Sequence, residues 1–213
     1  MSDTRAADAR SRWEVVVPLR ASAGRVAPVT HLRSTLLASS IQTLKARGLL
    51  SQYLEKLPRE LHPTVLEAVA GGWMPIAIGA AHYAAADALA LSQDAIFDNG
   101  RAVADRVQNT MLGTLVRAAK SVGVTPWIGL EQFQRLWDRL LLGGSGAVYR
   151  TGAKEARVES HGNPLVRWSY FRHSWRGMFA ASGELFCDRF YVTEVSVPAF
   201  DSTAPFVMRV AWS

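Results

Sequence analysis

The last third of the chain carries two hairpin patterns separated by a helical segment, and this order restricts the possible folds more than any other feature. The first hairpin spans 147–159, where short strand-forming runs flank the turn residues Thr151 and Gly152. The second spans 190–212, across a loop of proline, aspartate, serine and threonine. The aromatic segment between them, Trp168 to Phe186, predicts a helix. The sequence therefore predicts a β-β-α-β-β unit built on an antiparallel sheet.

The chain before this unit predicts a bundle of helices at about 30–143. Glycine or proline marks most of the helix ends, as Pro75 does for an alanine-rich helix. Ser92 caps a long segment that Gly100 and Gly113 interrupt, which predicts a kink or a break into two helices.

After a short N-terminal tip, the chain is predicted to form one α+β domain. Its 213 residues suit a single domain, and 49% hydrophobic content is ordinary for a globular core. We predict a disordered tip at 1–12 and a domain over 13–213, with a helical part at about 30–143 and a sheet part at about 146–213. The run from Trp13 to Pro18 predicts a strand or an extended arm, which adds either to its own sheet or to that of a neighbouring molecule.

The sequence predicts no secretion signal, membrane span or disulfide. Its first residues include acids where a signal peptide needs basic residues. The longest apolar run, Pro75 to Leu91, contains His82 and Asp87 and is shorter than the ~20 residues of a bilayer crossing. The single cysteine, Cys187, excludes an internal disulfide and a cysteine-based metal site. We therefore expect a cytoplasmic protein.

The chain is basic, with a net charge of +6 and a pI of about 9.9. A basic surface is typical of phosphate binding, so a nucleic acid or another phosphoanion is an alternative class of partner. The basic residues are mostly arginines spread along the whole chain, and arginine also pairs with carboxylates at protein interfaces. The charge leaves this alternative open without favouring it.

No pattern of residues predicts catalysis. The five histidines share no metal-ligand spacing, and the chain has neither a Gly-x-Ser-x-Gly nor a Gly-x-Gly-x-x-Gly motif. The glycine-rich run at 143–146 resembles a phosphate-binding loop only in composition, because no lysine follows it. Glu155, Arg157 and Glu159 alternate along a predicted strand, which indicates one solvated face. We predict a protein that is not an enzyme, with no catalytic residue, metal or cofactor.

Basic and aromatic side chains are most densely interleaved at 167–176. Interleaving of this kind can bind single-stranded nucleic acid, but on a helix the aromatic side chains fall on one face that the hairpins would cover. Large inward-facing aromatics either fill a core or line an apolar ligand pocket. The candidates for such a pocket are Trp137, Trp168, Phe171, Trp175 and Phe179. Arg172 and Arg176 flank this stripe, and we expect them to lay their stems along it or to bind an anion.

Several short stretches carry a resemblance to a known superfamily. They are Ser92 to Gly100, Arg135 to Trp137, Gly162 to Phe171, Arg176-Gly177 and Val210 to Trp212. With a helical bundle before β-β-α-β-β, they resemble the superfamily that joins haem-based nitric-oxide sensor domains, 4-vinyl-reductase-type ligand-binding domains and the TRAPP vesicle-tethering subunits of Golgi transport. Within it, the chain is most similar to a haem-free, myxobacterial-type family of uncharacterised proteins.

The resemblance also implies what a haem-binding member would need, and this chain lacks both features. Such members bind iron through a histidine on a central helix and hold the haem propionates with a Tyr-x-Ser-x-Arg motif. This sequence has no histidine between His82 and His161, and neither Tyr149 to Ala153 nor Tyr170 to Ser174 matches the motif. Because an axial ligand is the protein's means of controlling haem iron, we expect a protein without haem.

For function, the resemblance implies a scaffold that holds a small ligand or pairs with other proteins. We therefore expect a non-catalytic, sensor-like or adaptor domain in signalling. It is expected to bind a small apolar ligand or a partner protein, and to form a homodimer. The alternative, from a different class, is a basic protein that binds nucleic acid or a phosphoanion.

Overall fold

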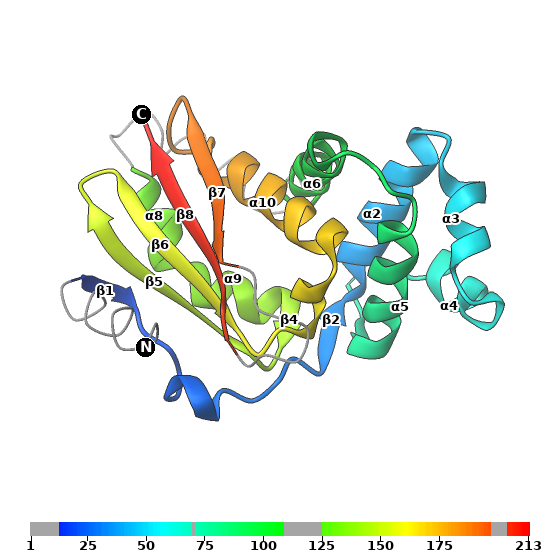
Figure 1. Ribbon diagram of the computed structural model, residues 1–213, viewed down its shortest axis with the longest axis horizontal. Helices are drawn as coiled ribbons and strands as arrows, with labels where there is room; N and C mark the ends of the chain where they lie inside the picture. Colours follow the sequence, from blue (N-terminus) through cyan, green and yellow to red (C-terminus); the bar gives the residue numbers. More distant parts are fainter. Residues whose placement is uncertain (1–12, 70, 109–124, 197–203) are drawn as a thin grey trace.

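The computed structural model describes residues 13–69, 71–108, 125–196 and 204–213, and in these segments helices lie beside two antiparallel sheets (Figure 1). The helices are α2 (Ser34–Ala46), α3 (Leu50–Lys56), α4 (His62–Leu66), α5 (Ile76–Asp87), α6 (Gln93–Gln108), α8 (Pro126–Glu131), α9 (Phe133–Leu140) and α10 (Ser169–Gly183). The strands are β1 (Glu14–Val17), β2 (His31–Arg33), β3 (Trp73–Pro75), β4 (Leu141–Leu142), β5 (Ser145–Gly152), β6 (Glu155–His161), β7 (Phe190–Ser196) and β8 (Phe206–Trp212). The predicted α+β class and the β-β-α-β-β order are confirmed. The tip predicted at 1–12 lies outside the described residues.

The larger sheet has five antiparallel strands in the order β1-β5-β6-β8-β7. The two predicted hairpins lie next to each other because β6 pairs with β8. β1 adds to the outer edge of β5, with Glu14 opposite Arg150 and Val15 opposite Tyr149. The N-terminal arm therefore belongs to its own sheet, which corrects the alternative that it extends the sheet of a neighbouring molecule.

A second sheet, which the sequence did not predict, joins three distant segments in the order β3-β2-β4. Leu32 lies opposite Met74 on one side and Leu141 on the other, and all three side chains are buried. Strands of two or three residues are too short to show a period of two along the sequence. The small sheet holds β2, α5 and the end of α9 together (Figure 1).

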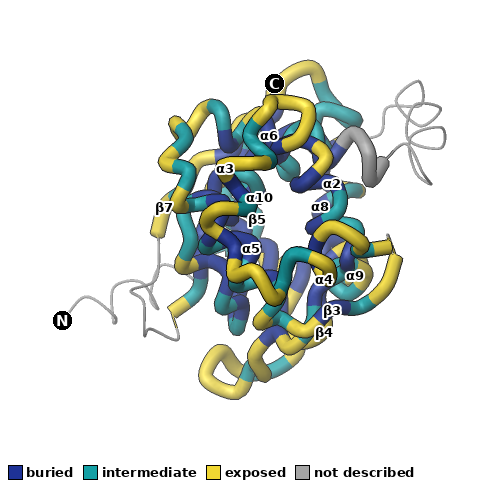
Figure 2. The backbone as a smooth tube through the Cα atoms, turned by 90° about the vertical axis from the view of Figure 1, so that its right-hand side faces the viewer, coloured by how far each residue is buried: buried dark blue, intermediate teal, exposed yellow. Residues whose placement is uncertain are grey.

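One face of the larger sheet is buried against α8, α9 and α10. Phe206, Met208, Val210 and Trp212 alternate along β8 and are all buried, so they form the core face of this strand. The ring of Trp212 stacks on Phe190 at 5.9 Å and meets a tryptophan of α8 edge-on at 5.0 Å. Figure 2 shows the buried segments on the inside of the molecule and exposed residues around its rim, where β7 lies.

The helix α6 runs through Gly100 as one element, so the chain does not break into two helices at that residue. Ser92 caps it as expected, with its Oγ accepting a main-chain N–H of the first turn at 3.2 Å. Gly100 instead lies against the backbone of α10 at Ser174. Gly113 lies outside the described residues.

The alanine-rich helix α5 begins directly after Pro75, as the sequence predicted. Its buried residues include His82 and Tyr83, which bring polar groups into the centre of the helical part. None of the helices that the structure describes is long and apolar enough to cross a membrane.

Candidate functional site

Four of the five aromatic residues predicted to line a pocket lie together between α9 and α10. The ring of Trp175 stacks on Phe171 with centroids 5.5 Å apart and meets Trp137 edge-on at 6.2 Å. Phe179, one turn further along α10, lies 6.1 Å from Trp175. Trp137, Phe171 and Trp175 are each at most 5% exposed. These rings form one packed cluster.

Two further rings, which the sequence analysis did not single out, extend this aromatic cluster. Phe133 of α9 meets Phe179 at 5.3 Å, and Tyr83 of α5 meets Phe171 edge-on at 5.0 Å. Trp168, the residue before α10, makes a different contact: the guanidinium of the preceding arginine lies 5.0 Å from its ring. The structure therefore brings Trp137, Phe171, Trp175 and Phe179 together and places Trp168 at the helix start.

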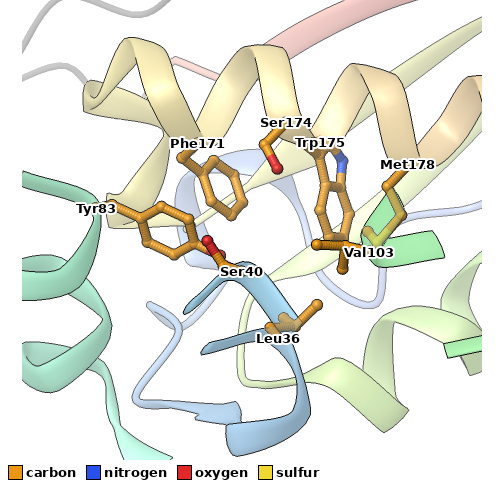
Figure 3. Close-up of a pocket in the computed structure, with 8 residues that line it drawn as sticks. All are labelled: Leu36, Ser40, Tyr83, Val103, Phe171, Ser174, Trp175 and Met178. Carbon is orange, nitrogen blue, oxygen red and sulfur yellow. The ribbon is translucent and has the colours of Figure 1, made fainter. Parts of the chain in front are cut away.

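The aromatic cluster leaves little open space among the helices. Figure 3 shows the cavity there, with Tyr83 pointing in from α5 and Phe171 and Trp175 from α10. The lining residues are Leu36, Ser40, Tyr83, Val103, Phe171, Ser174, Trp175 and Met178. The volume of about 10 Å³ is room for about one water molecule, whereas small-molecule pockets hold roughly 300–1,000 Å³. In this arrangement the rings fill the space.

A chain of hydrogen bonds runs through the interior beside this cavity. His82 Nδ1 lies 2.8 Å from the hydroxyl of Tyr53, and His82 Nε2 lies 3.1 Å from Ser40 Oγ. Ser40 Oγ lies 3.4 Å from the hydroxyl of Tyr170, which accepts from Asn99 Nδ2 at 3.2 Å. The hydrophobic pattern of the sequence did not predict this network. The available signal was a histidine inside the alanine-rich helix, because a polar side chain on an apolar face is usually hydrogen-bonded there.

Burial sets the protonation states in this network. It lowers the pKa of His82 to about 3, so the imidazole is neutral at pH 7. Burial, with a smaller contribution from Tyr170, raises the pKa of Tyr53 well above its ordinary value and keeps its hydroxyl protonated. A neutral network with both imidazole nitrogens engaged links the helices but offers no free base or metal ligand.

The two arginines predicted to bind an anion differ in their partners. Arg172 forms an ion pair with Glu194, at 3.4 Å from Nε to Oε2, and donates to two main-chain carbonyls of the turn before α10. Arg176 donates from Nη1 to His173 Nδ1 at 2.9 Å and from Nη2 to the carbonyl of Val192 at 3.2 Å. Burial lowers the pKa of His173, which keeps that nitrogen an acceptor. Among the described residues, Arg176 has no carboxylate partner.

Glu159 corrects the expectation of a solvated face on β6. Its side chain is fully buried: Oε1 accepts from Arg157 Nε at 2.7 Å, and Oε2 lies 2.9 Å from His161 Nε2. Glu155 lies four residues earlier on the same face of the strand, is partly exposed to solvent and pairs with Arg209. Alternation identified the shared face correctly, but it could not show that one end of that face is covered.

The chain matches no protein-family model and no curated protein. Solved structures do share its fold. A mutant of the Fe(II) unliganded H-NOX protein from K. algicida matches with a TM-score of 0.60 and 10% identity, over 85% of this chain and 97% of that one. The fold is that of H-NOX domains.

Two other solved structures match at a similar level. A structure from work on haem distortion in the H-NOX family has a TM-score of 0.55 and 13% identity, over 85% of this chain and 95% of that one. A structure from work on haem redox potential and porphyrin distortion has the same score and identity, over 85% of this chain and 100% of that one. The likeness shows the fold alone, so the superfamily and the haem-free, myxobacterial-type family within it stay predictions.

The described residues of this chain do not fit a haem group. The cavity among α2, α5, α6 and α10 has a volume of about 10 Å³, and both ring nitrogens of His82 beside it are hydrogen-bonded. His161 lies with Glu159 on the other face of the larger sheet. Nor do any three histidine, cysteine, aspartate or glutamate side chains of the described segments gather as they would around a metal ion.

Proposed function

We propose that this chain is a non-catalytic, haem-free binding module on the H-NOX fold, which works in the cytoplasm by contact with a partner protein. The observation that carries this proposal is the aromatic cluster, whose rings occupy the interior between the helices and the sheet. The cavity that remains has a volume of about 10 Å³, so a haem or another small apolar ligand would have to displace packed side chains.

A partner protein is favoured over a small apolar ligand by the same packing. Trp137, Phe171 and Trp175 contact one another through ring faces and edges, as rings in a protein core do. A binding site for another protein needs only an accessible surface. The fold neighbours give no indication of catalytic activity. Homodimer formation and a place in signalling belong to this proposal.

The positive charge does not by itself favour nucleic acid, the alternative class of partner. Six described arginines each have a carboxylate partner. The pairs are Arg20 with Asp138, Arg101 with Glu184, Arg150 with Glu14, Arg157 with Glu159, Arg172 with Glu194, and Arg209 with Glu155. Paired arginines contribute less to a field that attracts phosphate. A salt-dependent shift of nonspecific DNA would support the alternative and contradict the proposal.

The proposal is tested by titrating the full chain with haemin and, separately, with benzene. We expect no stoichiometric Soret band and no benzene-dependent rise in melting temperature. Trp175→Ala is the matched control, because removing a buried ring leaves an apolar cavity that can take up benzene. If Trp175→Ala does not fold, Phe179→Ala takes its place. Stoichiometric haem, or benzene binding by the unmodified chain, would contradict the proposal.

A further inference from the structure

A groove of about 400 Å³ lies on the surface between α6, α10 and β7. Phe97 and Arg101 reach it from α6, Arg176 and Ala180 from α10, and the residues from Arg189 to Thr193 form the third side. Figure 1 shows the three elements side by side, with β7 next to α10 and α10 next to α6. The groove is far larger than the cavity of about 10 Å³ beside the aromatic cluster, so it has room for side chains of a bound segment.

The strand beside this groove, β7, is an edge strand of the larger sheet. β8 pairs with one side of it, and the other side faces the groove. The carbonyl of Val192 points to that side, because it accepts from Arg176 Nη2 at 3.2 Å. On an edge strand, main-chain groups of every second residue point away from the sheet and can pair with an added strand.

The groove carries more positive than negative charge. Arg101, Arg176 and Arg189 line it against Asp94 and Glu184, which leaves a net charge of +1. Arg101 and Glu184 form a two-point ion pair, with distances of 2.9 and 2.6 Å, and so largely neutralise each other. Arg176 and Arg189 have no carboxylate partner among the described residues, and both bring positive charge to the first half of β7.

We propose that this groove binds an extended, acidic segment of a partner protein. The inference rests on the proposed function, because it names the surface and the chemistry of that partner. The segment runs along the open side of β7, where Arg176 already occupies the carbonyl of Val192. It pairs with the outward main-chain groups of Phe190 and places a carboxylate at Arg176 and Arg189. One apolar side chain of the segment lies over Phe97. A second copy of this chain does not suit the groove, because its own β7 would bring a second Arg189 to the same positive surface.

The experiment is a selection of displayed ten-residue random peptides on the full chain. We expect the enriched peptides to be acidic, with apolar residues at alternate positions. The strongest binder is then made synthetically and titrated against the unmodified chain and against Arg176→Ala and Arg189→Ala. We expect each substitution to weaken binding about tenfold and added salt to weaken it further. Arg59→Ala, an exposed arginine of the helical part, is the matched control and should leave the affinity unchanged.

A second measurement separates strand addition from charge alone. In amide NMR spectra, the acidic peptide should shift and protect the main-chain N–H groups of Phe190 and Val192 more than those of β1. Enriched peptides without acidic residues, affinities that neither groove substitution changes, or shifts away from β7 would overturn the groove proposal. Haem binding by the unmodified chain would instead contradict the proposed function, and the peptide titration does not depend on that result.

Discussion

Gly100 of α6 and Gly177 of α10 bring the backbones of the two helices into direct contact. A Cβ at Gly100 would lie 1.9 Å from the carbonyl oxygen of Ser174, and a Cβ at Gly177 would lie 1.9 Å from that of Phe97. Each helix therefore needs glycine where the other passes. This close crossing places Phe97 beside Arg176, whose guanidinium lies 5.9 Å from the phenyl ring, and so sets one wall of the groove beside β7.

Replacing either glycine of this crossing should destabilise the protein. Gly100→Ala and Gly177→Ala force the helices apart, and we expect each to lower the free energy of unfolding by about 3 kcal/mol or more, the upper end for overpacking. Urea unfolding measures the loss. Gly24→Ala is the control, because no atom lies within 4 Å of its added methyl group. Wild-type stability in Gly177→Ala would mean that the two helices do not cross here.

Truncation of Trp212 tests the core face of β8. The side chain is 8% exposed and lies between the rings of Phe190 and Trp127. Trp212→Ala should cost about 3–5 kcal/mol, as loss of a buried aromatic ring does. Tyr191→Ala, at an exposed position on the other face of the sheet, should change stability little. Equal melting temperatures for the two variants would contradict the assignment of the faces.

Much of this architecture could be predicted from the sequence. The hairpins, β8 and the helix caps are local patterns, in which turn residues, alternation and capping groups lie within a few positions of each other. The order of the helical and sheet parts followed from the same local patterns, and the family resemblance rested on that order. The small sheet could not be predicted, because Leu32, Met74 and Leu141 are far apart in the chain. Their strands are also too short to show the two-residue period of a β-strand.

The candidate site could be predicted only in part, for a different reason. Helical projection placed Phe171, Trp175 and Phe179 on one face, but it could not show that Tyr83 and Phe133 close the space between them. It also could not distinguish the partners of two neighbouring arginines on the same helix. Such features depend on contacts between distant segments, which cannot be read from the hydrophobic period or the composition of the sequence.

Acid should destabilise the protein through His82. Its pKa falls from 6.5 in the unfolded chain to about 3 in the fold, so between these values the unfolded state binds the additional proton. The free energy of unfolding therefore decreases as the pH falls through this window, by up to about 1.4 kcal/mol per pH unit from this group. The lowered pKa of His173 acts in the same direction.

Urea unfolding at a series of pH values measures the contribution of His82. His82→Gln removes the titrating group while the carboxylates remain the same in both proteins. Its stability should therefore depend less steeply on pH between 6 and about 4 than that of the wild type. Identical slopes for the two proteins would show that His82 is not a buried neutral imidazole.

Glu159 should matter for stability far more than Glu155. Glu159→Gln leaves Arg157 and His161 without the buried carboxylate between them, and losing one partner of a buried pair costs about 3–5 kcal/mol. Glu155→Gln removes only a surface pair with Arg209, and such pairs contribute little. Calorimetric melting of both variants checks this. A larger loss in Glu155→Gln would contradict the burial of Glu159.

Native mass spectrometry shows whether this protein, with its H-NOX fold, works without haem. The full chain is produced in cells supplied with haem precursor and purified without a haem-removing step. We expect the mass of the polypeptide, or a whole multiple of it, with no haem or other small molecule bound. A mass increased by one haem per chain would contradict it.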